Sequence, residues 1–438
     1  MSSILIFLTI LGFLVIAHEM GHFLVAKIRG VKVIEFGLGY PPKIVGFKYG
    51  ETTYTLNLLP LGGFVRMHGE DGVDALNDPR SFTSKGPFTR LAILAAGAAV
   101  NAILPIFLFT MAATLPQQVH SSDVIITKIE SISPAQTSGL MQGDAIRIVD
   151  GSRIIRAAEL QKNIYLKLGE ASHWEVERQG LTVELEIKPR IDHPTGQGPV
   201  GISIAEGKVR VESVHHGEIS SKNKLLMGDL ILSVGSADHQ DQIIINDVEE
   251  LSTALKLKAE KAVSPDDISI LVWRNGQLNY LNPSGTVLQF LQDVELSTLP
   301  RVSISEPLHV AFFNSFQRLF EILVLLKNEL SRVLFGSANF DIAGPIGIAQ
   351  ITGEIASDGF ITLITWTALL SINLAIINLL PIPALDGGRI LFVLIELFSG
   401  GRRIPPEKEK IVHFLGFAFL MTAIILVSVQ DIRRLILD

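Results

Sequence analysis

Hydrophobic and polar residues are unevenly distributed along this chain. Long apolar stretches lie at residues 3–26, 91–115, 361–399 and 411–429, whereas residues 120–305 have the mixed pattern of an ordinary globular protein. About 20 consecutive apolar residues are needed to cross the hydrocarbon core of a membrane. The pattern therefore predicts a polytopic α-helical membrane protein with four spans, two before and two after a large globular insertion.

Composition supports the membrane prediction and excludes two other kinds of site. The mean hydropathy of the 438 residues is +0.39 and only 18% of them are charged, which is uncommon for a soluble protein of this size. The net charge of −7 provides no basic surface for nucleic acid. Because the sequence has no cysteine, neither a disulfide framework nor a thiol nucleophile is present.

The first apolar stretch is predicted to be a retained membrane anchor and not a cleaved signal peptide. No Lys or Arg precedes it, and no small-x-small cleavage site follows it. Positive charges come afterwards, at Lys27, Arg29 and Lys32. By the positive-inside rule the amino terminus then lies outside and the far end of this helix lies in the cytoplasm.

The next segment, residues 31–67, has a different pattern. It mixes β-branched and aromatic residues with Gly and Pro, which is typical of short strands and turns. We expect a membrane-associated β-sheet loop here, on the cytoplasmic side. The second span then returns the chain outward, so the globular insertion is predicted to be extracytoplasmic.

An internal repeat lies within this insertion. Gly143-Asp144 and Gly228-Asp229 are 85 residues apart, about the length of one small domain. In each copy the Gly-Asp turn leads into an apolar strand, a turn and a helix-like stretch. The pattern G-L-x-x-G-D-x-I of the first copy resembles PDZ domains, in which a groove between a strand and a helix receives an extended peptide. Two PDZ-like α+β domains are predicted, and two small β-domains serving as spacers are the alternative.

The helix expected after the insertion, at residues 311–335, is interrupted by charge. The charged residues are Arg318, Glu321, Lys327, Glu329 and Arg332. They are too frequent for a comfortable span, so we expect an amphipathic helix on the outer membrane surface, with a fifth span as the alternative. The predicted domains are a membrane core at 1–118, PDZ-like domains at 119–200 and 201–292, a connecting region at 293–358 and a membrane core at 359–438.

The third apolar stretch is longer than one span requires, and four helix-breaking residues interrupt it: Pro381, Pro383, Gly387 and Gly388. A broken helix at membrane depth is tolerated only where protein or a water-filled cavity covers the freed backbone groups. Positive charges follow from Arg389 onward, which places this end inside. The break is therefore expected on the same side of the membrane as the inner end of the first span.

Within the first span lies an H-E-x-x-H motif, formed by His18, Glu19 and His22. On a helix the two histidines are one turn apart and share a face, which suits two nitrogens that converge on one metal ion. Glu19 projects beside them, where it can take a proton from a metal-bound water and deliver it to a leaving amine. Ionisable residues inside a span are costly and favour a functional interpretation over a structural cluster of hydrogen-bonded histidines.

A catalytic zinc site has three protein ligands and one open position. Asp386 is the strongest candidate for the third ligand, because it is an acid at the break of an otherwise apolar segment. A helix cap is the alternative role for this residue, and it is compatible with ligation. Four further candidates are weaker: Glu35, Glu51, His413 and Glu396.

Together these motifs resemble the site-2 protease family of intramembrane zinc metalloproteases, most closely its bacterial regulators of the sigma-E response. The resemblance covers nearly the whole chain and implies a zinc ion bound by His18, His22 and Asp386, with Glu19 as the catalytic acid/base. Three residues correspond to the family's N-x-x-P-x-P-x-L-D-G motif: Asn378, which would hold the substrate backbone, and Pro381 and Pro383, which would shape the unwound segment. Gly97 and Asn101 resemble the family's G-x-x-x-N element in the second span.

The resemblance also implies a substrate and a place. The expected substrate is a single-span membrane protein such as an anti-sigma factor, first trimmed by an upstream site-1 type protease, and signal-peptide remnants are the alternative. The expected location is the bacterial inner membrane, with the PDZ-like domains periplasmic and the active site near the cytoplasm. Because a membrane helix must unwind before hydrolysis, we expect an exposed strand edge in the 31–67 loop, at Thr53, Tyr54 and Thr55, to pair with the substrate.

Two other functions remain open at the level of sequence. One is a membrane-tethered zincin that cuts soluble peptides, which the position of the motif within the apolar run disfavours. The other is a non-catalytic metal-binding scaffold or a transporter, for which the broken third helix is the only support. Glu19 disfavours it, because a structural zinc site does not need that glutamate.

Overall fold

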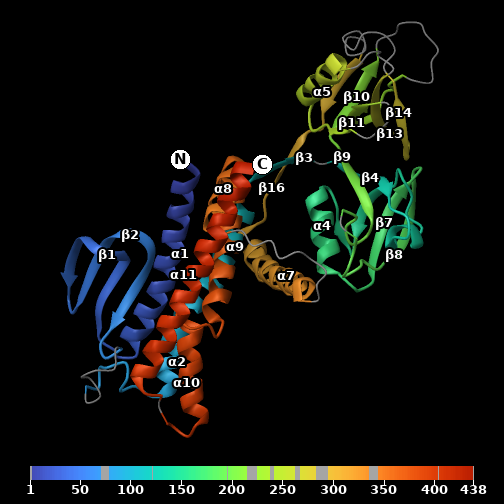
Figure 1. The fold of residues 1–438 in the computed structure, drawn as a ribbon. Helices are drawn as coiled ribbons and strands as arrows, with labels where there is room; N and C mark the ends of the chain where they lie inside the picture. The colour runs from blue at the N-terminus through green and yellow to red at the C-terminus, as the bar shows by residue number, and fades with distance from the viewer. Residues whose placement is uncertain are drawn as a thin grey trace. The chain divides into compact units, whose positions relative to one another are not determined.

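The computed structural model of the chain divides into two compact units (Figure 1). The helical unit comprises Met1–Leu115, Ser305–Leu319 and Asp341–Asp438, and the sheet unit comprises Pro116–Ile304 and Phe320–Phe340. The structure describes residues 2–70, 78–120, 122–194, 196–214, 224–236, 241–261, 267–282, 294–334, 344–402 and 404–437. Parts of the second sequence repeat, residues 217–223 and 237–238, lie outside the described residues.

Among the described residues, seven helices of 13 or more residues belong wholly or partly to the helical unit. They are α1 (Ser2–Ile28), α2 (Pro87–Thr114), α7 (Leu308–Leu334), α8 (Pro345–Ser357), α9 (Phe360–Leu379), α10 (Asp386–Phe398) and α11 (Pro406–Leu437). Among the described residues, five helices are long and apolar enough to cross a membrane: α1, α2, α7, α9 and α11. The four predicted spans correspond to α1, α2, the α9–α10 pair and α11, and α7 is the additional helix.

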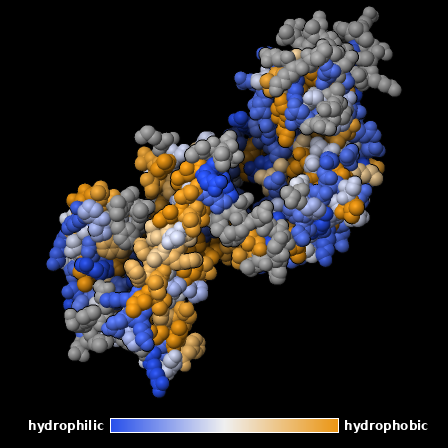
Figure 2. Space-filling model, viewed as in Figure 1, coloured by the Kyte–Doolittle hydropathy of each residue, from blue (hydrophilic) through white to orange (hydrophobic). Residues whose placement is uncertain are grey.

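Apolar side chains cover the outside of these helices. Hydrophobic residues dominate the visible face of the helical unit, whereas the visible face of the sheet unit is largely hydrophilic (Figure 2). On α11, Phe414, Phe419 and Leu426 are all more than half exposed. A soluble protein rarely exposes a contiguous apolar surface of this kind, so the pattern is that of a membrane protein.

Close packing between α1 and α2 depends on a glycine. A Cβ atom added to Gly21 would lie 2.8 Å from the carbonyl carbon of Ala96, so only glycine allows the two backbones to approach so closely. Farther along, Arg90 of α2 and Glu396 of α10 form a buried ion pair, with 2.6 Å between guanidinium and carboxylate. These contacts fix α2 between α1 and α10.

A β-sheet follows α1 in the helical unit. It is formed by β1 (Val33–Tyr49) and β2 (Thr52–Met67), two long strands that each bend. The first half of β1 pairs both with residues 63–67 and with residues 53–56 of β2, and residues 43–49 pair with residues 52–57. The sheet therefore has four segments, in the order 43–49, 52–57, 33–38 and 63–67.

This order corrects the prediction that Thr53, Tyr54 and Thr55 provide an exposed edge. Tyr54, for example, is paired with Phe36 on one side and with Phe47 on the other. The three residues are interior because each long strand bends and contributes two segments, which the alternation of residue types does not reveal. Within the described residues of this sheet, the segments paired on one side only are 43–49 and 63–67.

The sheet unit contains two modules with the same topology. In the first, the strands follow the order β8-β7-β5-β4-β9, with β6 paired to β5; in the second the order is β14-β13-β11-β10-β15, with β12 paired to β11. The first module comprises β4 (Asp123–Ile129), α3 (Pro134–Thr137), β5 (Ala145–Val149), β6 (Ser152–Arg153), α4 (Ala157–Leu166), β7 (Ser172–Arg178), β8 (Leu181–Ile187) and β9 (Ile202–Gly207). The second comprises β10 (Val209–Val214), β11 (Leu230–Ser236), β12 (Ile243–Ile244), α5 (Val248–Lys261), β13 (Ile268–Arg274), β14 (Gln277–Leu281) and β15 (Val294–Thr298).

Each module ends on an edge strand that lies beyond its predicted boundary. β9 pairs with β4 and so belongs to the first module, although the boundary was expected at residue 200. β15 pairs with β10 in the same way, beyond the expected end at residue 292. In each module the edge strand comes last in the chain, after the hairpin that completes the rest of the sheet. A separate two-stranded sheet, β3 (Gln117–His120) with β16 (Arg301–Ile304), joins the segments that enter and leave the modules.

The Gly-Asp turns of the repeat have the same structural role in both modules. Asp144 is 1% exposed and accepts hydrogen bonds from Nε and Nη2 of Arg178. Asp229 is equally buried and accepts the same pair of bonds from Arg274. Hydrogen bonding to these carboxylates raises the pKa of both guanidinium groups. The sequence repeat is therefore also a repeat in three dimensions.

Candidate metal centre

Three candidate ligands from distant parts of the sequence meet in the helical unit. His18 and His22 lie one turn apart on α1, and their Nε2 atoms are 3.1 Å apart. Oδ2 of Asp386, the first residue of α10, lies 3.0 Å from Nε2 of His18 and 3.1 Å from Nε2 of His22. Among the residues that the structure describes, this is the group of three metal-ligating side chains close enough to share one ion.

The donor set fits a zinc ion. Two ligand atoms that each lie about 2.1 Å from a tetrahedral zinc are about 3.4 Å apart, so the three observed spacings are within a few tenths of an ångström of that arrangement. Gly97 of α2 leaves the necessary space, because a Cβ atom there would lie 2.6 Å from Nε2 of His18 and closer still to Nε2 of His22. Both imidazoles are buried, which limits competition from bulk water.

Hydrogen bonds to acceptors on α2 set the orientation of the histidine rings. Nδ1 of His22 donates to the carbonyl oxygen of Ile93 over 2.8 Å, which leaves Nε2 unprotonated and free to bind a metal. The side-chain amide of Asn101 lies 3.5 Å from Nδ1 of His18, and its Oδ1 atom is buried without a partner among the described residues. With the amide turned over, Oδ1 accepts the Nδ1 proton of His18, and Nε2 of both rings faces the ligand site.

Glu19 lies beside this group and next to the sheet. Its side chain is half-buried and close enough to His18, His22 and Asp386 to interact with their charges. A Cβ atom added to Gly63, in the 63–67 edge segment of β2, would lie 3.0 Å from Cγ of Glu19. The glutamate therefore stands between the three candidate ligands and one open edge of the sheet.

Comparison with known proteins agrees with this geometry. Residues 6–423 match the sequence profile of Peptidase family M50. The chain belongs to this family, the site-2 proteases. Similar proteins include the zinc metalloprotease RasP of Geobacillus kaustophilus, which is 29% identical over 100% of this chain and 99% of its own length. RasP of Bacillus licheniformis is 29% identical over 100% of both chains, and the regulator of sigma-W protease RasP of Bacillus subtilis is 28% identical over 100% of this chain and 99% of its own. The protein is thus a zinc metalloprotease.

In this M50 peptidase the weaker third-ligand candidates are engaged elsewhere. Glu35 accepts a hydrogen bond from Thr55 and pairs with Arg66 within the sheet. Glu51 pairs with Lys27 and Arg80, and Glu396 pairs with Arg90. His413 of α11 contacts the backbone of the segment that precedes Asp386. Asp386 is therefore the candidate whose carboxylate reaches the histidines.

The segment between α9 and α10 positions Asp386. Pro381 and Pro383 lie in it, and since neither has a backbone N–H, α9 cannot continue through them. Leu385 is the N-cap of α10, so Asp386 is the first helical residue and not the cap. A Cβ atom at Gly387 would lie 2.5 Å from the carbonyl oxygen of Leu379, which shows how tightly this segment folds back on α10.

Two further residues complete the surroundings of the centre. Arg389, one turn after Asp386, forms an ion pair with Glu70, which follows β2. This pair connects the sheet to the start of α10. Asn378 is half-buried and lies in the last turn of α9, just before the break.

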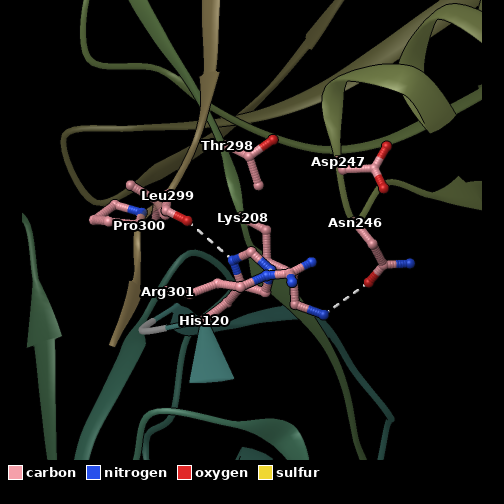
Figure 3. A pocket seen from close by; sticks show the side chains of 8 residues that line it. All are labelled: His120, Lys208, Asn246, Asp247, Thr298, Leu299, Pro300 and Arg301. Carbon is pink, nitrogen blue, oxygen red and sulfur yellow. Dashed lines mark hydrogen bonds between the residues drawn. The ribbon is translucent and has the colours of Figure 1, made fainter. Parts of the chain in front are cut away.

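A separate cavity of about 460 Å³ lies in the sheet unit, and its lining is shown in Figure 3. His120 donates from Nδ1 to the carbonyl oxygen of Leu299 and accepts at Nε2 from Nε of Arg301. Nζ of Lys208 donates to Oδ1 of Asn246. Because these polar groups bind one another, the cavity contains no set of converging free groups comparable to the metal centre.

Proposed function

We propose that this M50 peptidase hydrolyses peptide bonds in or near the transmembrane segment of single-span membrane proteins, with zinc bound by His18, His22 and Asp386. The observation that carries the proposal is the position of the three converging ligands. Two of them lie on α1, a helix long and apolar enough to span a membrane, well inside its ends. A peptidase acting on soluble peptides has no need of ligands at that depth.

In this mechanism Glu19 transfers the proton. A bound zinc ion supplies Lewis acidity, which makes a water molecule more acidic and polarises the scissile carbonyl. Glu19 accepts the proton of the attacking water as its oxygen adds to the carbonyl carbon. The carbon–nitrogen bond then breaks, and Glu19 delivers the proton to the leaving amine nitrogen. The hydrogen bonds that the histidine rings donate to Ile93 and Asn101 keep these rings oriented throughout.

Substrate capture is proposed at the edge segment 63–67. A transmembrane helix satisfies its own backbone groups, so its scissile bond is accessible only after local unwinding. Residues 63–67 are paired on one side only, and Gly63 lies against Glu19. An unwound strand added at this edge would pass directly beside the proton-transferring carboxylate. Asn378, in the last turn of α9 before the break, is proposed to hold the substrate backbone.

The proposed physiological substrate is an anti-sigma factor. The name of the Bacillus subtilis relative, regulator of sigma-W protease, supports this class of substrate. Signal-peptide remnants are the second class, because they too are short membrane helices with little attached outside. We place the protein in the bacterial cytoplasmic membrane, with the metal centre near the cytoplasmic side, because Lys27, Arg29 and Lys32 follow the ligand helix.

The two modules of the sheet unit are proposed to be extracytoplasmic PDZ-like domains that select substrates already trimmed by an upstream protease. β9 and β15 are edge strands, each paired with one neighbour among the described strands. Each lies near the helix of its own module, α4 and α5 respectively. A strand edge beside a helix is the arrangement that receives the end of an extended peptide, which trimming would create.

The decisive experiment replaces Glu19 with Gln in the full-length protein. Glutamine keeps the size of the side chain but cannot accept the proton of the attacking water. We expect zinc content equal to that of the wild type and loss of cleavage of a model single-span substrate, measured in detergent with and without chelator. Asp386→Asn is the matched variant, and it should lose both zinc and cleavage.

Three outcomes would each contradict a different part of the proposal. Cleavage that persists in Glu19→Gln removes Glu19 from the mechanism. Full zinc content in Asp386→Asn removes Asp386 from the ligand set. Cleavage of an unstructured soluble peptide as fast as that of the membrane helix would favour the membrane-tethered zincin instead.

A further inference from the structure

The residues just before Asp386 hold a strained backbone conformation. Ala384 has φ = 83°, in the left-handed region that residues with a side chain avoid. It lies between Pro383 and Leu385, in the segment that leaves α9 and enters α10. Such a conformation persists only where surrounding contacts enforce it. The contacts that do so come from a third helix, α11.

Two residues of α11 touch this segment. The backbone N–H of Ala384 donates a hydrogen bond of 2.9 Å to Nδ1 of His413. One turn farther along, a Cβ atom at Gly416 would lie 2.6 Å from the carbonyl oxygen of Pro383. Residues three apart share a face of a helix, so His413 and Gly416 meet consecutive residues of the segment from the same side.

The hydrogen bond also defines the state of His413. Because the backbone N–H is the donor, Nδ1 must be unprotonated and Nε2 carries the proton. Nε2 lies 3.8 Å from Oε1 of Glu409, one turn earlier on α11. The ring packs against Phe392 of α10, with 5.5 Å between the ring centroids. Packing against α10 therefore keeps His413 in the orientation that accepts the hydrogen bond from Ala384.

We propose that His413 and Gly416 form a brace that holds Ala384 in its left-handed conformation and so keeps Asp386 at ligand distance from His18 and His22. His413 is a positioning residue here: it touches the backbone before the ligand, and not the metal or the substrate. This inference rests on the proposed role of Asp386 as a zinc ligand. It gives α11 a part in metal binding, although none of its side chains belongs to the ligand set.

The test compares His413→Leu with His413→Asn in the full-length protein, by chelator competition for zinc. Leucine leaves the partly buried N–H of Ala384 without this acceptor, so zinc affinity should fall about 10-fold, as it does when groups that orient ligands are removed. Asparagine presents Oδ1 near the place of Nδ1, so affinity should return close to the wild-type value. Gly416→Ala disturbs Pro383 independently of the hydrogen bond and should also weaken zinc binding; it gives a second measurement if His413→Leu does not fold.

A second pair of variants asks whether the brace acts through backbone strain. Glycine adopts φ = 83° without steric cost, so Ala384→Gly needs less support from α11. His413→Leu should therefore weaken zinc binding less in the Ala384→Gly background than in the wild type. An equal loss in both backgrounds would show that His413 acts by another route and would overturn the inference.

Failure of the brace is distinguishable from failure of the ligand assignment. Wild-type zinc affinity in His413→Leu and Gly416→Ala, together with loss of zinc in Asp386→Asn, would refute the brace and leave the proposed ligand set intact. Unchanged zinc affinity in Asp386→Asn would refute both.

Discussion

Gly97 provides a sharp test of whether the space at the metal centre is needed for zinc. A Cβ atom at this position would lie 2.6 Å from Nε2 of His18, which is 0.8 Å inside the 3.4 Å at which ordinary van der Waals contact begins, and it would lie closer still to Nε2 of His22. Metal–ligand distances tolerate deviations of only about 0.2 Å. Gly97→Ala must therefore displace both nitrogens or push α2 away from α1, and either change spoils the ligand geometry.

We expect zinc affinity in Gly97→Ala to fall by about 100-fold, equivalent to about 2.7 kcal/mol, since removing a single outer-shell contact already costs 10-fold to 100-fold. The assay is chelator competition on the full-length protein, followed by metal analysis. Gly12→Ala is the matched control, because it also adds a methyl group to a helix of this bundle but meets nothing within 4 Å. It should bind zinc like the wild type.

A result that refutes the reasoning is easily recognised. If Gly97→Ala retains wild-type zinc affinity, the metal does not occupy the space enclosed by His18, His22 and Asp386 next to α2. Thermal unfolding of the metal-free proteins separates this outcome from general damage. A Gly97→Ala variant as stable as the Gly12→Ala variant without metal, but deficient in zinc, supports the steric argument.

Two predictions concern stability. Arg90→Met should destabilise the helical unit by about 3 to 5 kcal/mol because it removes the guanidinium group that pairs with the buried Glu396 carboxylate. The double variant with Glu396→Met should recover most of that loss in thermal unfolding in detergent. Equal losses in the single and double variants would contradict this. Asp144→Asn should destabilise the first module of the sheet unit by about 2 to 3 kcal/mol, and Asp229→Asn should destabilise the second by a similar amount, because each carboxylate pairs with the corresponding arginine of its own module. Urea unfolding measures both losses. A large effect in one module only would show that the two turns are not equivalent.

Much of the helical unit and the centre of the site could be predicted from sequence because each signal is local. The sequence shows an apolar run of sufficient length, a pair of histidines four residues apart and an acid after a Pro-rich break. Each of these signals lies within one short segment of its own. The third proposed ligand required one long-range inference, that Asp386 would reach α1 from a position 364 residues after His22. The charge pattern made that inference feasible by placing both segments on the same side.

The residues whose roles the sequence does not reveal make contacts with backbone atoms, or matter because they lack a side chain. Ile93 orients His22 with its carbonyl oxygen, which any residue could supply. Gly63 matters because it has no side chain where its backbone approaches Glu19, and the residues beside it in the sequence do not indicate this contact. His413 is a weaker ligand candidate in the sequence because it lies in or near the last apolar stretch, whereas its contact in the structure is with a backbone N–H. Contacts of this kind depend on how distant helices pack, so a local pattern does not reveal them.

The three proposed ligands differ in how firmly the fold fixes them. His18 and His22 are separated by one helical turn, so their spacing is set by the hydrogen bonds of α1 and by the close approach of α2 at Gly21 and Gly97. Asp386 follows a segment without regular structure, and its position depends on contacts with several other elements. The ion pair between Arg90 and Glu396 fixes α10 against α2, and the pair between Arg389 and Glu70 fixes its start against the sheet. Of the three ligands, Asp386 is therefore the one whose distance from the metal is most sensitive to changes elsewhere in the helical unit.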